Sequence, residues 1–191
     1  MDELVVDSCH RALVQLGDLS RYRETEVPSK KRNWQPAKAY YGLASLLKPN
    51  SGFSHNQLAV IARIDGDHLS ALYHLYRALS VNDPYPRAEE NLKTELKKLI
   101  SFKDRALVRY YEGHLSSGLD ANTVSVCLHA QLHTDQLAAH HGELENEALS
   151  HLLVETKERS EAGFLTKFCL SAIAAQHLLS NHKQSMNLSK P

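Results

Sequence analysis

Apolar side chains recur every three or four residues along most of the chain, as at Leu149, Leu152 and Leu153. Strict alternation of apolar and polar residues, which is typical of strands, is hard to find. The chain holds only 8 glycines and 6 prolines. Spacing of this kind places apolar positions on one helix face. The pattern predicts an all-α fold, with helices over residues 2–25, 35–48, 52–65, 68–82, 86–101, 103–117, 121–141, 143–159 and 162–181.

Two segments of the chain share one pattern: a small residue, a large residue four positions later, and a second small residue three positions after that. The first segment is Ala37, Tyr41 and Ala44, and the second, 34 residues further on, is Ala71, Leu75 and Ala78. Pro49 and Pro84 follow these two segments, and Leu58 and Leu92 are also 34 apart. The tetratricopeptide repeat has this period. Its small residues allow close helix packing, and the proline ends the second helix. The repeat predicts antiparallel helical hairpins stacked as a tetratricopeptide-like, right-handed α-solenoid; the alternative is chance recurrence.

The length of 191 residues suits one domain. We expect a single helical-repeat domain over residues 1–181, with the tetratricopeptide core over 1–100 and additional hairpins over 101–181. A third and weaker match to the repeat, Ala106, Tyr110 and Gly113, falls in the second part. Residues 182–191 are polar, and we expect them to form a tail.

Charge and cysteine content restrict the classes of partner. The 22 basic and 22 acidic residues balance, so the whole chain has no electrostatic attraction for nucleic acid or anionic lipid. The 3 cysteines are an odd number without a CxxC pair, which favours a reducing compartment. No apolar run approaches the length of a membrane span. We therefore expect the nucleus and cytoplasm, without a membrane partner.

Motifs of catalysis and metal binding are missing from the sequence. It has no glycine-rich phosphate loop, no GxSxG, no HExxH and no cysteine-pair zinc pattern. His129 and His133 would share one helix face, with His140 and His141 further on, but a metal needs three or four ligands. The sequence therefore predicts a protein that is not an enzyme and holds no metal or cofactor.

One constellation suggests a phosphate site. Arg21 and Tyr22 lie near the end of the first predicted helix, and Asn56 lies on the third. A guanidinium offers a planar fork of donors to phosphate oxygens, and the phenol and the amide add directed donors. The alternative is structural: Arg21 pairs with Asp18 or Asp67, and Asn56 is a repeat residue.

Four further residues are candidate contacts. Arg63 and Asn91, with Asn56, would line the concave face of a repeat groove that binds a peptide. Lys93 and Lys97 form a small basic face on one predicted helix, which could touch nucleic acid. The alternative for the lysines is an ordinary solvated surface.

The sequences and the order of several segments resemble those of the Ever Shorter Telomeres / SMG family, whose members are a telomerase-associated subunit and adaptors of nonsense-mediated mRNA decay. The segments are residues 16–23 (LGDLSRYR), 39–41 (AYY), 56–62 (NQLAVIA), 66–69 (GDHL), 76–79 (YRAL) and 84–92 (PYPRAEENL). They cover about residues 8–100. The insertion at residues 28–34 and the sequence at residues 76–79 resemble those of fungal members.

The resemblance implies a 14-3-3-like domain followed by tetratricopeptide and hairpin elements. It implies that Arg21 contacts phosphoserine on a partner, typically the phosphorylated decay helicase, with Tyr22 beside it, and that Asn56 steadies the bound peptide. The leading hypothesis is therefore an adaptor that binds a phosphorylated protein in mRNA decay. The alternatives are a telomerase-associated DNA/RNA-binding module and a generic tetratricopeptide scaffold.

Family members carry long helices ahead of the segment that matches residues 16–23, and these hold another basic phosphate ligand. Only about 16 residues precede Gly17 here. We expect an incomplete groove whose exposed N-terminal edge is open to self-association with a second copy.

Overall fold

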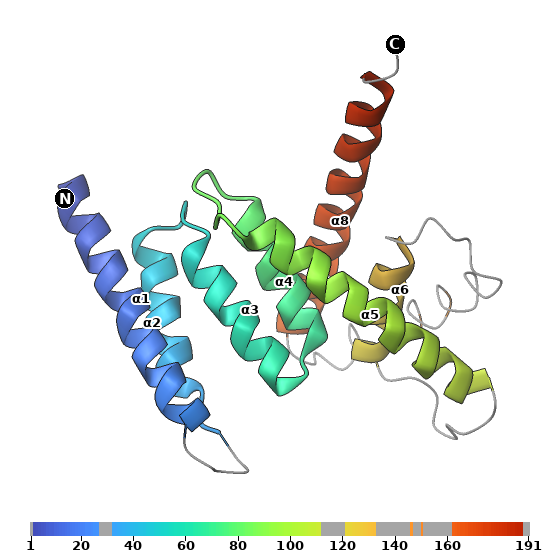
Figure 1. Ribbon diagram of the computed structural model, residues 1–191, viewed down its shortest axis with the longest axis horizontal. Helices are drawn as coiled ribbons and strands as arrows, with labels where there is room; N and C mark the ends of the chain where they lie inside the picture. The colour runs from blue at the N-terminus through green and yellow to red at the C-terminus, as the bar shows by residue number, and fades with distance from the viewer. Residues whose placement is uncertain are drawn as a thin grey trace. The chain divides into compact units, whose positions relative to one another are not determined.

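The computed structural model describes residues 2–26, 32–111, 121–132, 146, 150 and 162–188. Its elements in this part of the chain are α-helices, which confirms the all-α prediction (Figure 1). They are α1 (Glu3–Glu26), α2 (Gln35–Leu47), α3 (Phe53–Asp65), α4 (His68–Leu79), α5 (Ala88–Tyr111), α6 (Ala121–Leu132) and α8 (Ala162–Leu188). The chain divides into two compact units, Met1–Leu92 and Lys93–Pro191. The right-handed solenoid and the single domain over 1–181 stay predictions.

Adjacent helices pack in pairs in the first unit, α1 with α2 and α3 with α4, and α3 also contacts α2 and α1. Figure 1 shows α1 and α2 side by side. Gly17 meets Tyr41, and Asp7 meets Lys48, so α1 and α2 run antiparallel. All six residues of the 34-residue pattern are at most 1% exposed: Ala37, Tyr41, Ala44, Ala71, Leu75 and Ala78. The pattern therefore marks the buried faces of α2 and α4.

The α1–α2 pair depends on a glycine. A Cβ atom added to Gly17 would lie 2.4 Å from Cε1 of the Tyr41 ring, closer than two non-bonded carbon atoms can approach. Tyr41 is fully buried in a cluster with Val14, Trp34 and Ile61 and two alanines of α2. The ring is therefore held from its other sides and cannot move away from α1 without opening the core.

Backbone hydrogen bonds join the turn before α3 to the turn before α5. The Gly52 N–H donates to the Asp83 carbonyl at 2.8 Å, and the Asp83 N–H donates to the Asn50 carbonyl at 2.9 Å. Ser51 and Asp83 form an isolated parallel bridge. Gly52 has no room for a side chain, since an added Cβ would lie 2.4 Å from the Ala78 carbonyl oxygen. Two successive hairpins are thus connected through their main chains.

The turn from α3 to α4 follows local rules. Gly66 has a φ of 74°, a left-handed conformation that glycine adopts without strain, and its N–H bonds the carbonyl of Arg63. Asp67 then caps α4 by accepting a hydrogen bond from the Ser70 N–H at 3.0 Å. These two residues explain why α3 ends and α4 begins within a few positions.

Several predicted helix boundaries are wrong. The prediction of separate helices over 86–101 and 103–117 fails because α5 runs unbroken from Ala88 to Tyr111, and this stretch holds neither proline nor glycine. α4 ends at Leu79 rather than at residue 82, and α8 continues to Leu188, into the predicted polar tail. The predicted helix over 143–159 lies outside the described residues except for Asn146 and Ser150.

In the second unit, α6 packs against α8. Among the described side chains of these two helices, Val124, Cys127, Ala130, Ser171 and Ala175 are fully buried. His129 is 1% exposed, and its Nδ1 lies 2.8 Å from the Ser125 carbonyl oxygen. Within the described residues, no helix combines the length and the apolar content that crossing a bilayer requires.

Replacing Gly17 with alanine tests the close approach of α1 and α2. We expect Gly17→Ala to lower the free energy of unfolding by up to about 2 kcal/mol, because overpacking costs ~1–3 kcal/mol and the helix-propensity gain of ~1 kcal/mol offsets only part of this cost. Gly42→Ala in α2 is the matched control, since no atom lies within 4 Å of its added Cβ, and we expect it to stabilise. Urea unfolding followed by circular dichroism measures both. Equal effects of the two substitutions would contradict the role of Gly17.

Candidate functional site

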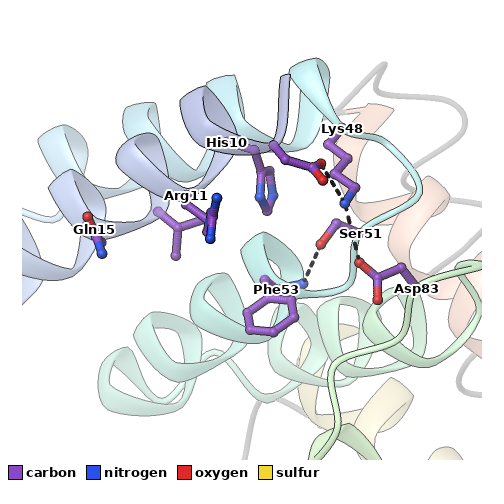
Figure 2. Close-up of a pocket in the computed structure, with 9 residues that line it drawn as sticks. His10, Arg11, Gln15, Lys48, Ser51, Phe53 and Asp83 are labelled. Atoms are coloured by element: carbon purple, nitrogen blue, oxygen red, sulfur yellow. Dashed lines mark hydrogen bonds and ion pairs between the residues drawn. The ribbon is translucent and has the colours of Figure 1, made fainter. Parts of the chain in front are cut away.

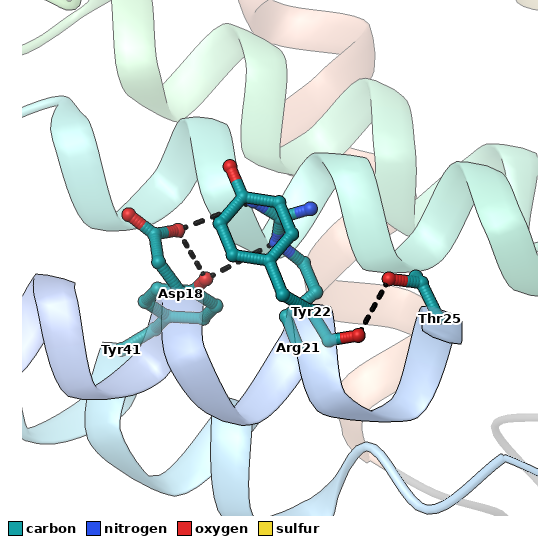
Figure 3. Close-up of polar contacts among 5 residues, drawn as sticks. All are labelled: Asp18, Arg21, Tyr22, Thr25 and Tyr41. Atoms are coloured by element: carbon teal, nitrogen blue, oxygen red, sulfur yellow. Dashed lines mark hydrogen bonds and ion pairs between the residues drawn. The ribbon is translucent and has the colours of Figure 1, made fainter. Parts of the chain in front are cut away.

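Arg21 lies on the buried face of α1 and is 8% exposed. Its Nη2 donates to Asp18 Oδ1 at 3.3 Å, and its Nε donates to the Tyr41 hydroxyl at 3.3 Å. The Tyr41 hydroxyl in turn donates to Asp18 Oδ1 at 2.7 Å (Figure 3). Arg21 thus pairs with Asp18, one of the two carboxylates that the sequence offered. The three side chains form a closed triangle between α1 and α2.

The triangle keeps Arg21 charged and Tyr41 neutral. Burial acts to lower the pKa of Arg21, but hydrogen bonds with Tyr41, Tyr22 and Asp18 outweigh it and raise the pKa. Burial, and then the neighbouring Asp18 carboxylate, raise the pKa of the Tyr41 phenol far above its usual value. At neutral pH the group at the centre of this site is therefore a fixed guanidinium cation.

Tyr22 lies beside Arg21, as adjacent positions require, and is 51% exposed. The Arg21 Cζ atom is 4.3 Å from the centroid of the Tyr22 ring, which is a cation–π distance (Figure 3). Thr25 donates its hydroxyl to the Tyr22 carbonyl at 2.8 Å. The Tyr22 ring therefore covers one side of the guanidinium while remaining open to solvent.

Asn56 lies on α3 and is 3% exposed. Its Oδ1 accepts a hydrogen bond of 2.8 Å from Asn91 Nδ2, at the start of α5. The structure thus brings Asn56 together with Asn91 and Arg21 together with Tyr22. Among the described contacts, none joins the Arg21 pair to the Asn56 pair.

The other candidate contacts are more exposed. Arg63 is half-buried near the end of α3, and Lys93 and Lys97 are exposed, one turn apart on α5. All three residues lie at helical positions, as predicted, although the helix that carries Lys93 and Lys97 is longer than expected. Their part in partner binding stays a prediction.

A cavity that the sequence did not indicate lies between the first half of α1 and the turn before α3 (Figure 2). Its volume is about 360 Å³. The lining residues are Asp7, His10, Arg11, Val14, Gln15, Lys48, Ser51, Phe53 and Asp83. They come from three separate stretches of the chain, and no short motif connects them. The sequence analysis also did not predict the hydrogen bonds of the buried Tyr41 hydroxyl, although a tyrosine at a core position of a repeat needs a polar partner.

Two histidines meet beside Asn56. His55 of α3 and His74 of α4 place their Nδ1 atoms 3.1 Å apart, with the rings stacked at a centroid distance of 5.4 Å. Burial, helped by the positive charge of Arg77, lowers the pKa of His55 to about 4. His55 is therefore neutral at pH 7.

Within the described residues, no group of three or more histidine, cysteine, aspartate or glutamate side chains converges on a point where a metal ion would fit. His129 is the one member of the predicted histidine face that the structure describes, and it is a buried core residue. His133, His140 and His141 lie outside the described residues.

Comparison with known proteins settles the family. Residues 37–190 match the family model of the Est1 DNA/RNA binding domain. The chain belongs to the Est1 family. This confirms the resemblance to the Ever Shorter Telomeres / SMG family; the fungal character stays a prediction.

Relatives of the chain include decay factors and telomere proteins. It is 47% identical over 85 residues to nonsense-mediated mRNA decay factor SMG7-like of Arabidopsis thaliana, covering 44% of this chain and 10% of the relative. It is 34% identical over 102 residues to SMG7 of Danio rerio, covering 53% and 8%. It is 31% identical over 107 residues to the telomere elongation protein est1 of Schizosaccharomyces pombe, covering 56% and 21%. The Est1-family chain thus spans between 8% and 21% of the length of these relatives, and none of their names describes an enzyme.

The buried His55 predicts a pH dependence of stability. Its pKa in the folded protein is about 4, below the ordinary value of 6.5, so the unfolded chain takes up a proton that the folded chain rejects. The free energy of unfolding should fall by up to about 3 kcal/mol as the pH drops from 6.5 to about 4. Urea unfolding across this pH range measures the slope.

His55→Gln should make the free energy of unfolding depend less steeply on pH, by the amount that corresponds to about one bound proton. The parent chain, unfolded at the same pH values, is the reference for this comparison. An unchanged slope in His55→Gln would exclude His55 as its source.

Proposed function

We propose that this chain is the partner-binding part of an adaptor in nonsense-mediated mRNA decay and that it binds a phosphorylated protein. Its relatives named as decay factors, from a plant and a fish, support the pathway. The observation that carries the phosphate contact is the Arg21 guanidinium, held in place by Asp18 and Tyr41 beside the exposed Tyr22.

The geometry of Arg21 suits a ligand contact. Its two hydrogen bonds use Nε and Nη2, so the Nη1 edge is the part that would meet phosphate oxygens. A side chain already held in one orientation loses little entropy when it binds. Asp18 has an opposing effect, since its carboxylate offsets part of the positive charge that the phosphate would feel.

Asn56 would act on the peptide rather than on the phosphate. Its Oδ1 is used by Asn91, so its Nδ2 remains as a donor toward a backbone carbonyl of the bound chain. Arg63 would extend the same contact surface along α3. Asn56 and Arg21 then contribute separate contacts to one extended ligand.

Variants of Arg21 test this function in binding measurements with a phosphoserine peptide and the unphosphorylated peptide of the same sequence. We expect Arg21→Gln to weaken binding of the phosphopeptide roughly 10- to 100-fold, because a hydrogen bond to a charged group contributes ~1.5–3 kcal/mol. Arg21→Lys keeps the charge without the fork, and its loss should be smaller. Isothermal titration calorimetry gives the affinities, and thermal melting verifies that each variant is folded.

Asp18→Asn is the matched variant in the same triangle. It keeps the shape of the carboxylate and removes its charge, so we expect phosphopeptide affinity to rise about 3- to 10-fold. Equal binding of the phosphorylated and unphosphorylated peptides would refute the phosphate contact. Binding that ignores Arg21 but fails in Asn91→Ala would instead favour a generic repeat groove for an unmodified peptide.

A second candidate function is a telomerase-associated module that contacts DNA or RNA. It is supported by the description of the family model, by the telomere elongation relative and by two exposed lysines one turn apart, Lys93 and Lys97. Two lysines on one helix face can contact successive phosphates of a single strand. Telomerase components would then be partners.

Salt dependence tests the nucleic-acid contact. Binding of oligo(U) RNA or of single-stranded telomeric DNA should weaken linearly with the logarithm of salt concentration. In the double variant Lys93→Ala/Lys97→Ala, the slope should fall by about 1.4, since each phosphate contact on a single strand contributes ~0.7. Fluorescence anisotropy at several salt concentrations measures the slope. A slope that the double variant leaves unchanged would remove these lysines from the interface.

A further inference from the structure

We propose that the cavity between α1 and the turn before α3 binds one apolar side chain of a peptide whose neighbouring residue is acidic. The cavity is a second recognition site on α1, and none of its lining residues takes part in the Arg21 triangle. Its volume of about 360 Å³ is enough for one large side chain and part of its backbone.

Val14 and Phe53 form the apolar part of the wall. Phe53 is 37% exposed, although it is the first residue of α3 and a large aromatic side chain. Tyr85 packs against its ring in a T-shaped arrangement, with centroids 5.0 Å apart and planes at 87°, and fixes its orientation. An oriented and partly open aromatic ring is a favourable surface for an aliphatic or aromatic side chain that leaves water.

The polar part of the wall contains a histidine without a complete set of partners. His10 is 5% exposed, and its Nε2 makes no hydrogen bond within the described part of the chain. Figure 2 shows its ring directed from α1 toward the turn that carries Ser51. A buried polar atom without a partner is costly, and a peptide backbone brings both donors and acceptors. Gln15, at the exposed side of the cavity, adds an amide that can meet the same backbone.

The charges of the wall select for an acidic residue. Lys48 is already engaged, since its Nζ lies 2.9 Å from Asp7 Oδ1 and 3.7 Å from Asp83 Oδ2. Burial, together with the nearby Lys48, lowers the pKa of His10, so its imidazole is neutral at pH 7. Arg11 is exposed and forms no ion pair among the described residues. The cation that remains for a ligand is therefore Arg11.

The same charges disfavour a nucleic acid in the cavity. Asp7 and Asp83 together balance Lys48 and Arg11, so the site has no net positive charge when His10 is neutral. A phosphate chain would bring several negative charges near two carboxylates and would gain one cation. A peptide with one acidic side chain brings a single negative charge, which can pair with Arg11, and therefore meets less of this repulsion.

Selection from a random peptide library displayed on phage tests the site with the full chain as bait. We expect an enriched motif that pairs a large apolar residue with aspartate or glutamate. A synthetic peptide with this motif should lose at least about 10-fold in affinity to Arg11→Glu and to Gln15→Trp, which fills the exposed side of the cavity. The same peptide with its acidic residue changed to lysine should regain binding to Arg11→Glu.

Arg23→Glu is the matched control, because it makes the same change of charge at an exposed position of α1 outside the cavity. It should change the affinity by less than about twofold. The synthetic peptide carries no phosphate, which separates this site from the phosphate contact. The proposal is overturned if no such motif is enriched, if Gln15→Trp binds the peptide as well as the parent chain does, or if oligo(U) RNA displaces the peptide.

Discussion

Close packing of the Tyr41 ring against Gly17 is the contact on which the first unit depends. Because position 17 has no side chain, the ring approaches the backbone of α1, and its hydroxyl reaches Asp18 and Arg21. Packing of the helix pair and orientation of the guanidinium therefore have one cause. A larger residue at position 17 would disturb both, so the stability of this helix pair and the orientation of the guanidinium cannot vary independently.

How far the sequence predicts the fold depends on the distance over which its signals act. The repeat of small and large residues identified the buried faces of α2 and α4, because helical periodicity is a local property. The same period, extended beyond residue 100, suggested a helix boundary near residue 102 where the chain has no breaking residue, and α5 continues through it. The presence or absence of helix-breaking residues therefore predicts the end of this helix better than the repeat period does.

For the candidate sites, too, contacts between residues close in the sequence were predictable and contacts between distant residues were not. Arg21 and Tyr22 are neighbours in the sequence, so their proximity was predictable, and Asp18 lies within one turn. The Tyr41 hydroxyl and the cavity were not predictable, since residues from Asp7 to Asp83 meet there only after three helices have packed. If both proposed sites on α1 bind the same ligand, the second contact becomes intramolecular, and the ligand binds more tightly than through either site alone.

The main-chain link between Ser51 and Asp83 has an evolutionary consequence. Hydrogen bonds between peptide groups do not depend on which side chains flank them, so most positions in these two turns can drift in identity. They do depend on register, and inserting or deleting one residue in either turn would misalign the donors and acceptors. Across Est1 proteins, these turns should therefore tolerate substitution far better than a change of length, with Gly52 as the exception.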